Sequence, residues 1–389
     1  DKDINAFALP GGYICANNGL IYTTLSEAEL AGVVSHEVGH VIQHHIFRNI
    51  SVHNRAQWTG IAGLVTAAIL APINPAMAMV VAQGGSAAGT QSMLSFSRDY
   101  EREADRVGQN LMYKAGFDAH AMPEFFQRMQ DRYKFNTNDA YAFLQSHPVT
   151  LERLSEAETR ANQLPTKMRA DSIDFLLTRE KCRIRQIELK DALKFYNSAI
   201  ATKRYVSLES QLYGLALTHY LQKNYEQSIQ TLDKISNPKF LINPIVAGLR
   251  AKQMIVIGKN DIADRLYEQS LARYPTHKGL WMGQLEFLIM IRAYPKAAYR
   301  LDELSLAFPM DPDVWDQYAI LYSDAKYNNP IRYHYGLGSE YIVLGHYPHG
   351  LEQYRAALKK KPANKEDDKI QSIISARIPE IMRAMPSKS

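Results

Sequence analysis

Apolar residues recur at helical spacing through the second half of the chain, in paired segments that repeat about every 34 residues from residue 173 onward. Trp281 and Trp315 lie 34 positions apart, and Pro275 and Pro309 precede them at the same interval. This period is typical of tetratricopeptide repeats, whose helix pairs stack into a solenoid. The pattern therefore predicts an α-helical solenoid over residues 173–389.

The individual repeats differ in clarity. Weaker units begin near residues 173, 209 and 244, and the segment from Trp315 is expected to run into the last helix pair with altered spacing. The last unit is the clearest, with small residues at close helix approaches, aromatic residues between them and a terminating proline: Leu337, Gly338, Tyr341, Gly350, Tyr354, Ala357 and Pro362. Such an array either offers a concave surface to peptides and proteins or only packs against the first half, and both are compatible.

The first residues have a different periodicity. Ala6, Leu9 and the run 13–16 are apolar and β-prone, and Asn18-Gly19 is a hairpin-type turn pair. These features predict a short strand pair, with an ordinary core hairpin as the alternative to a functional one.

Residues 56–97 contain no charged side chain. Their apolar runs, 61–71 and 76–82, are separated by Pro72-Ile73-Asn74-Pro75, before the run reaches the roughly 20 residues that a membrane span requires. We expect a hairpin, acting either as a lid or hydrophobic probe or as plain core packing. Met77, Met79 and Met93 suit an adaptable contact surface.

Length and composition agree with two domains. A chain of 389 residues is long for one core, and residues 161–170, with Pro165, read as a joint. We expect domains at 1–164 and 173–389 and a mainly α (α+β) fold, in which a small first domain with a short β element precedes the solenoid. The net charge of +5 is mild, so no nucleic-acid binding is expected.

The sequence His36-Glu37-Val38-Gly39-His40 contains candidate metal ligands and a candidate general base, and it makes the first domain one of the zincin type. Ser26 and Glu29 form a capping box that predicts a helix through it. Two histidines four residues apart share one helix face and can bind one metal ion, as in the helix of zinc peptidases. Such an ion lowers the pKa of a bound water, and the adjacent Glu37 is the candidate general base and acid.

A third ligand is expected from the acidic segment that opens a second helix. Spacing of four residues favours the pair Glu101 and Asp105 but also allows Asp99 and Glu103. Asp105 would orient a liganding imidazole by accepting its other N–H. A solvated helix face is the expected role of Arg102 and Glu103.

Four motifs together resemble the HtpX-related zinc metallopeptidases over residues 1 to about 160. They are His36-Glu37-x-x-His40, Glu101-x-x-Ala104-Asp105, Asn5-Ala6-Phe7-Ala8-x-Pro10-Gly11-Gly12, and Ser146-His147-Pro148 with Arg153. Within this family, the helical repeats that follow are similar to those of the periplasmic BepA-like members. The resemblance selects Glu101 as third ligand beside His36 and His40, implies one zinc ion per chain, and makes residues 5–12 similar to an edge strand along which an extended substrate lies.

The resemblance also makes His147 a site residue. Its ring is expected either to act as a fourth zinc ligand that keeps the enzyme latent, which this group favours, or to donate to the oxyanion. Arg153 is either a site residue or a structural ion-pair partner. His44, His45 and His53 have no motif support; His44 continues the face of His36 and His40, one turn too far to share their ion.

The resemblance implies a periplasmic zinc endopeptidase that degrades misfolded or stalled outer-membrane proteins and assists their assembly. The repeats would bind substrate or the outer-membrane assembly machinery, with peripheral membrane contact as a further expectation. A chaperone or assembly scaffold with a latent peptidase site is the alternative, and a membrane-embedded peptidase would need spanning helices that the sequence lacks.

Two features bear on the compartment. Cys15 and Cys182 would join the two halves if bridged, and two free thiols are equally compatible with the sequence. The chain begins at Asp1 without Met, directly before the proposed substrate strand. We therefore expect an upstream portion with a secretion signal.

Overall fold

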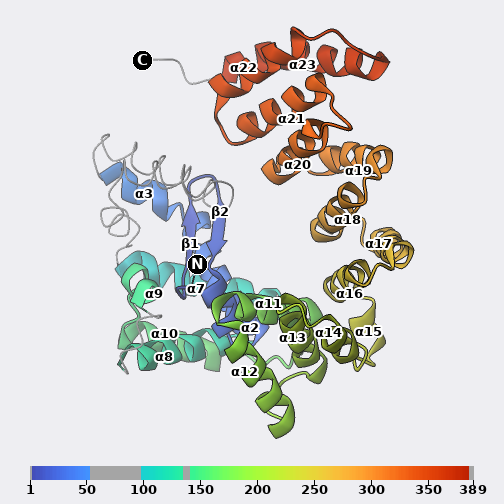
Figure 1. Cartoon of the computed structure of the whole chain (residues 1–389). Helices are drawn as coiled ribbons and strands as arrows, with labels where there is room; N and C mark the ends of the chain where they lie inside the picture. Colours follow the sequence, from blue (N-terminus) through green and yellow to red (C-terminus); the bar gives the residue numbers. More distant parts are fainter. Residues whose placement is uncertain (1, 53–97, 135–140, 385–389) are drawn as a thin grey trace. The chain divides into compact units, whose positions relative to one another are not determined.

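The computed structural model describes residues 2–52, 98–134 and 141–384 (Figure 1). Helices dominate, and the described residues contain one two-stranded sheet. The mainly α class expected from the sequence is confirmed. The charge-free segment 56–97 lies outside the described residues.

The hairpin pairs β1 (Ala6–Leu9) with β2 (Tyr13–Ala16) in antiparallel register, from Ala6 opposite Ala16 to Leu9 opposite Tyr13. Its turn is Pro10-Gly11-Gly12, where both glycines have positive φ (+92° and +84°). The strands were predicted correctly, but the turn was wrong. Asn18-Gly19 instead opens α1 (Asn18–Thr23), where a Cβ on Gly19 would lie 2.1 Å from the Lys2 carbonyl oxygen.

Two helices cross at small residues and form the framework of the first half: α2 (Glu27–Ile42) and α7 (Arg98–Lys114). A Cβ on Gly39 would lie 2.8 Å from the Ala104 carbonyl oxygen, and one on Gly108 would lie 2.7 Å from that of Ser35. Only glycine permits this approach, which brings the His-Glu-x-x-His face against the acidic face of α7.

A buried apolar cluster lies beneath this crossing. It joins Val33 of α2 and Met112 of α7 to Phe125 and Phe126 of α8 (Ala121–Lys134) and to Leu154 of α10 (Leu151–Asn162). Burial of these side chains, at about 25 cal/mol per Å², fixes the helices that carry the polar residues above them. The short helix α9 (Tyr141–Ser146) contributes Phe143 to the same cluster.

The remaining elements are helices that pack in sequence, α11 to α14 in one run and α17 to α23 in another. They are α11 (Ile173–Gln186), α12 (Leu189–Thr202), α13 (Leu208–Leu221), α14 (Tyr225–Leu232), α15 (Pro238–Leu241), α16 (Pro244–Val256), α17 (Asn260–Arg273), α18 (Lys278–Met290), α19 (Tyr294–Ala307), α20 (Pro312–Ser323), α21 (Pro330–Val343), α22 (Tyr347–Leu358) and α23 (Lys365–Ala384).

Equivalent contacts recur at the predicted period. The indole N–H of Trp281 in α18 donates to the Pro275 carbonyl at 2.7 Å, and that of Trp315 in α20 donates to the Pro309 carbonyl at 2.9 Å. The segment from Trp315 does not run on into the last unit, because α20 ends at Ser323 before α21 begins. The helix pairs agree with the expected repeats, whose assignment as tetratricopeptide units stays a prediction.

The contacts divide the chain into two compact units near residue 246. Within the first unit, α11 packs on α1, and the N-terminus of α2 bonds to the segment before α11. The Glu27 amide donates to Asp171, and the Ser172 amide and hydroxyl donate to the Glu27 carboxylate. Residues 163–172 thus continue the packing of the first unit, and the sequence-derived domain boundary there stays a prediction.

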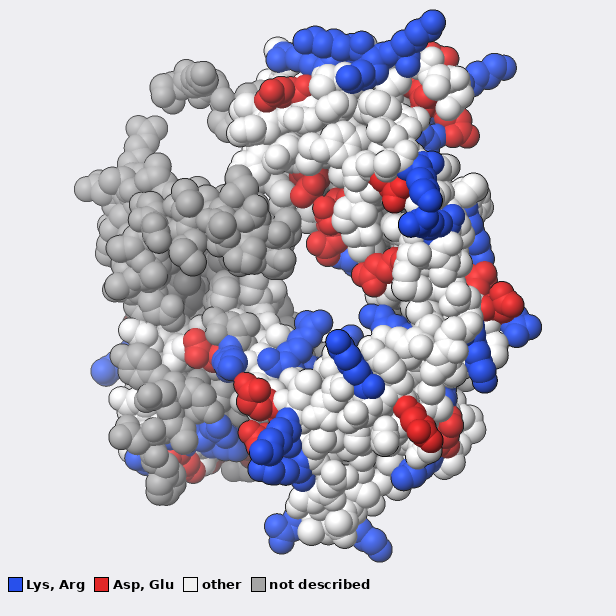
Figure 2. All heavy atoms as spheres, in the orientation of Figure 1, with Lys and Arg blue, Asp and Glu red and all other residues white. Residues whose placement is uncertain are grey.

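On the described part of the face shown in Figure 2, charged side chains of both signs are interspersed among uncharged ones, with Lys and Arg gathered over α22 and α23. Among the described residues, no helix is both long and apolar enough to cross a bilayer.

Candidate metal centre

Four buried side chains bring donor atoms to one point: His36, His40, Glu101 and His147. The two α2 imidazoles face each other with their Nε2 atoms 3.0 Å apart, and Glu101 of α7 lies 3.5 Å from the first and 3.3 Å from the second. His147 Nδ1 lies 3.2 Å from both His36 Nε2 and Glu101 Oε1.

This donor set fits zinc. Zinc bonds of about 2.0–2.2 Å in a tetrahedral site separate neighbouring donors by about 3.4 Å, close to the distances observed here. Three imidazole nitrogens and a carboxylate are also the ligand types that zinc prefers. The sequence predicted all four residues, and the structure brings them together.

The helix that carries the two histidines begins as expected. Ser26 caps α2 by accepting from the Glu29 amide, while the Glu29 carboxylate accepts from the Leu25 amide at 2.7 Å. Arg128 of α8 then binds the Glu29 carboxylate through two 2.5 Å hydrogen bonds. The start of α2 is therefore tied to a neighbouring helix, which fixes the direction of its histidine face.

Asp105 lies behind His36. Its Oδ1 accepts from the His36 Nδ1 at 2.9 Å, so the Nε2 of this ring points at the donor cluster. Of the two acidic pairs that spacing allowed, Glu101 and Asp105 reach the site, whereas Asp99 is exposed and Glu103 lies to one side.

Arg153, of α10, binds both carboxylates. Its guanidinium donates to both Asp105 oxygens at 2.7 and 2.8 Å and lies 2.8 Å from Glu101 Oε2. It also donates to the Pro148 carbonyl, next to His147. Arg153 is 2 % exposed, so it is part of the buried network. It pairs with the acidic residues of the site and does not enter the donor cluster.

Burial and these charges set the protonation of the metal-free site. Burial lowers the pKa of His36, but the hydrogen bonds and charges of Asp105 and Glu101 outweigh it and raise that pKa to about 10. Burial lowers the pKa of His40 to about 3 despite its hydrogen bond to Glu101. Burial raises the pKa of Asp105, but Arg153 overcomes this effect and holds it at about 2.

Glu37 lies beside the cluster. It is fully buried, and burial raises the pKa of its carboxyl above the usual value. The backbone amide of Ala8 in β1 opposes this rise, so the strand runs directly past the carboxylate. The second nitrogen of His147, Nε2, lies 3.3 Å from Glu37 Oε1. His147 therefore contacts the donor cluster with one nitrogen and the candidate base with the other.

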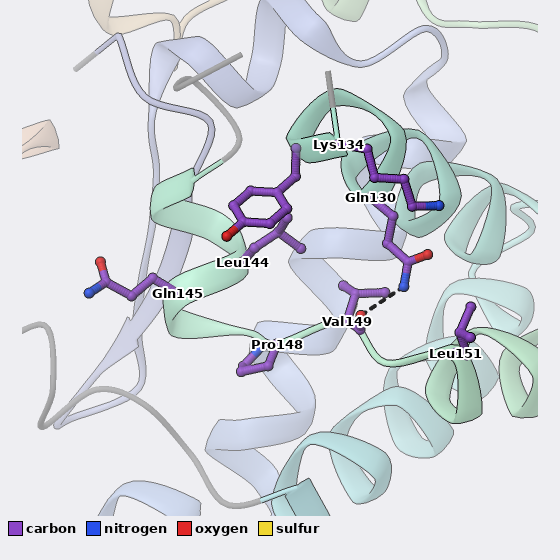
Figure 3. A pocket seen from close by; sticks show the side chains of 8 residues that line it. Gln130, Lys134, Leu144, Gln145, Pro148, Val149 and Leu151 are labelled. Atoms are coloured by element: carbon purple, nitrogen blue, oxygen red, sulfur yellow. Dashed lines mark hydrogen bonds between the residues drawn. The ribbon is translucent and has the colours of Figure 1, made fainter. Parts of the chain in front are cut away.

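The position of His147 depends on a short helix. The His147 amide donates to the Phe143 carbonyl at the end of α9, and the two rings lie 5.4 Å apart. A pocket of about 640 Å³ lies between the end of α8, α9 and the chain after His147. Figure 3 shows Leu144, Pro148 and Val149 lining it, with Gln130 donating to the Val149 carbonyl at 2.7 Å.

One residue of the site was missed by the sequence reasoning. His45, fully buried at the start of α3 (His45–Val52), places its Nδ1 3.0 Å from His40 Nδ1 and its Nε2 3.0 Å from Glu103 Oε2. Spacing along one helix could not find it, because His44 has a positive φ (+54°) that ends α2 and turns the chain back. Glu103 is likewise a partner of His45 as well as a surface residue, whereas Arg102 pairs at the surface as expected.

Comparison with known proteins matches residues 1–161 to the model of peptidase family M48. The chain is 32% identical over 237 residues to the putative beta-barrel assembly-enhancing protease of Vibrio cholerae, covering 60% of this chain and 49% of the relative. It is 28% identical over 331 residues to the beta-barrel assembly-enhancing protease of Yersinia pestis, covering 81% and 65%.

A more distant similarity is confined to the first part of the chain. The mitochondrial metalloendopeptidase OMA1 of Arabidopsis thaliana is 31% identical over 152 residues, which is 39% of this chain and 28% of that protein. The chain spans about half to two thirds of the length of the first two relatives. These findings confirm the resemblance to BepA-like metallopeptidases that the motifs carry, and M48 peptidases use zinc, which the donor cluster fits.

Proposed function

We propose, from the M48 peptidase match of residues 1–161, that this protein is a zinc-dependent endopeptidase of the cell envelope that degrades misfolded or stalled outer-membrane proteins. The buried cluster of His36, His40, Glu101 and His147 beside Glu37 is the observation that carries the proposal. Relatives named beta-barrel assembly-enhancing proteases support β-barrel proteins as the class of substrate. The periplasmic location belongs to the same proposal and rests on the resemblance that the motifs and repeats carry. Assistance in outer-membrane protein assembly belongs to the same proposal.

Each residue of the site has its own proposed role. His36, His40 and Glu101 would hold one zinc ion, which when bound would supply an activated water molecule and a Lewis acid for the scissile carbonyl. Glu37 takes a proton from the attacking water and delivers it to the departing amine; its raised pKa suits a group that must carry the proton between the two. Asp105 orients His36 through its Nδ1–H, and Arg153 keeps Asp105 ionised.

Substrate is expected to bind beside β1. The Ala8 amide faces Glu37, so the edge of β1 opposite β2 runs along the site. An extended peptide that pairs with this edge would carry its carbonyl groups past Glu37. The repeats of residues 173–389 would select that substrate or contact the assembly machinery, as stacked helix pairs do in other solenoids.

The proposed resting state is latent. His147 brings a fourth donor atom to the cluster and would so occupy the position that a water or substrate needs. It must leave before cleavage, after which its ring is available as a donor to the oxyanion. His147→Ala separates the two roles: faster proteolysis supports capping as the dominant role, and slower proteolysis supports the oxyanion role.

The first test is cleavage of casein by the zinc-loaded wild type, with Glu37→Gln as the blank and zinc content measured for both. We expect the wild type to cut and the variant to keep zinc without cutting. Loss of zinc from Glu37→Gln would overturn its role as base. Absence of cleavage by both the wild type and His147→Ala, with zinc bound, would overturn the peptidase proposal.

A second candidate function is a chaperone or assembly scaffold whose peptidase site is normally silent. The capping contact of His147 favours it, because a site closed at rest leaves binding as the prevailing activity. Binding of an unfolded outer-membrane protein by Glu37→Gln, at the affinity of the wild type, would support this function. Loss of that binding would count against it.

A further inference from the structure

The two imidazoles of α2 in the donor cluster, His36 and His40, are held by different kinds of hydrogen-bond partner. His36 donates its Nδ1–H directly to a carboxylate, that of Asp105. At the equivalent atom of His40 the contact is to a second imidazole, because His40 Nδ1 lies 3.0 Å from the Nδ1 of His45. The tautomer of His40 therefore depends on which of these two nitrogens carries the hydrogen.

The contact of the other His45 nitrogen, Nε2, shows which of the two nitrogens carries the hydrogen. Its Nε2 lies 3.0 Å from Glu103 Oε2, and an ionised carboxylate only accepts hydrogen bonds, so Nε2 carries the hydrogen. A neutral imidazole then has its lone pair on Nδ1. His40 Nδ1 must donate to that lone pair, which leaves the His40 Nε2 lone pair directed at the donor cluster.

Neighbouring side chains hold the His45 ring in place. The His45 ring stacks on Tyr100 of α7 with centroids 4.5 Å apart and planes 11° apart, and Arg48 lies over the same Tyr100 ring. Arg48 also donates to Glu103 at 3.1 Å, so the carboxylate is fixed from two sides.

We propose that His45 is a positioning residue for the metal centre. Its hydrogen bond to Glu103 makes the His45 Nδ1 an acceptor for His40 Nδ1–H, and this contact fixes the tautomer in which His40 binds zinc. This inference rests on the proposed function, because it concerns affinity for the same ion. An outer hydrogen-bond partner of a metal-binding histidine typically contributes 10–100-fold to metal affinity.

The test is the zinc dissociation constant, measured by competition with a chelator of known affinity, for folded full-length variants. His45→Phe keeps the ring and its stacking on Tyr100 but removes the acceptor, and we expect zinc to bind about 10–100-fold more weakly. His45→Asn restores an acceptor oxygen near the Nδ1 position and should recover most of the affinity. Glu103→Ala leaves His45 in place and should weaken binding by a smaller factor.

His44→Asn is the matched control, because it alters the exposed neighbouring histidine at a positive φ that Asn tolerates. It should bind zinc as the wild type does. Wild-type affinity in His45→Phe would overturn the inference while leaving the zinc-peptidase proposal intact, and so would equal losses in the Phe and Asn variants. Should His45→Phe fail to fold, wild-type affinity in Glu103→Ala would overturn the inference. Absence of zinc binding by the wild type would overturn both.

Discussion

At the residue scale, the site is a set of buried charges that neutralise one another. Asp105 and Glu101 are nearly inaccessible to water, and Arg153 is the buried cation that faces both. A buried carboxylate without a partner costs several kcal/mol, so this arginine stabilises the fold as well as the site. The family motif pointed to Arg153 and left open whether it is a site residue or an ion-pair partner, but the sequence did not show which carboxylates it binds.

We predict that Arg153→Met lowers the free energy of unfolding of the metal-free protein by about 3–5 kcal/mol, because two buried carboxylates lose their partner. Arg102→Met is the control: this arginine is 40% exposed and pairs with Glu152 and Glu156 at the surface, where solvent screens the ion pairs, so its loss should cost far less than that of Arg153. Urea unfolding in the presence of a chelator measures both. Equal losses in the two variants would contradict the buried-network account.

At the element scale, the helices differ in how far sequence alone could place them. The capping box at Ser26 and the apolar spacing located α2 correctly, since a helix start is a local event. The hairpin turn was misplaced because Asn18-Gly19 and Pro10-Gly11-Gly12 both suit a turn, and only packing of Gly19 against the N-terminal backbone excludes the first. The end of α2 at His44, which brings His45 back to the site, has no local signal.

The pair α20 and α21 carries a pH-dependent contact. Burial and, to a smaller extent, the charges of Asp316 and Asp313 together raise the pKa of Glu340 to about 7. The folded state thus holds a proton that the unfolded chain releases near its ordinary value of 4.5. The stability that this neutral group provides is complete below pH 4.5 and is lost as the pH rises through 7.

We predict that Glu340→Gln raises the melting temperature of the C-terminal helices, and that its advantage over the wild type grows between pH 5 and pH 8. Thermal unfolding at the two pH values measures this. Glu352→Gln, which removes an exposed charge of α22, should show little change with pH. If the difference in melting temperature between Glu340→Gln and the wild type does not change with pH, the raised pKa of Glu340 in the folded state is contradicted.

At the scale of the whole molecule, α11, the first helix of the predicted repeats, packs with the residues that match the M48 family. Apolar side chains of α11 are buried in the first unit, and Arg179 donates to the Leu25 carbonyl just before α2. Together with the bonds of Glu27 to Asp171 and Ser172, this ties α2, which carries His36 and His40, to residues beyond 164.

A truncation tests this coupling. We predict that a fragment of residues 1–164 melts at a lower temperature and binds zinc more weakly than one of residues 1–236, which keeps α11 to α14. Circular dichroism and chelator competition measure the two properties. Equal melting temperatures and affinities would instead support an independent domain that ends at 164.

The sequence by itself determined the helical class, the 34-residue period, the strand pair and the residues of the metal cluster. These features could be predicted because they depend on residues that are close together in the sequence, and because the motifs of the site resemble those of a known family. Only the tertiary structure decided where Arg153 and His45 lie and that His147 reaches both Glu37 and the donor cluster. Such contacts join residues that are distant in sequence or separated by a turn, and they form only when helices such as α2 and α7 pack through Gly39 and Gly108.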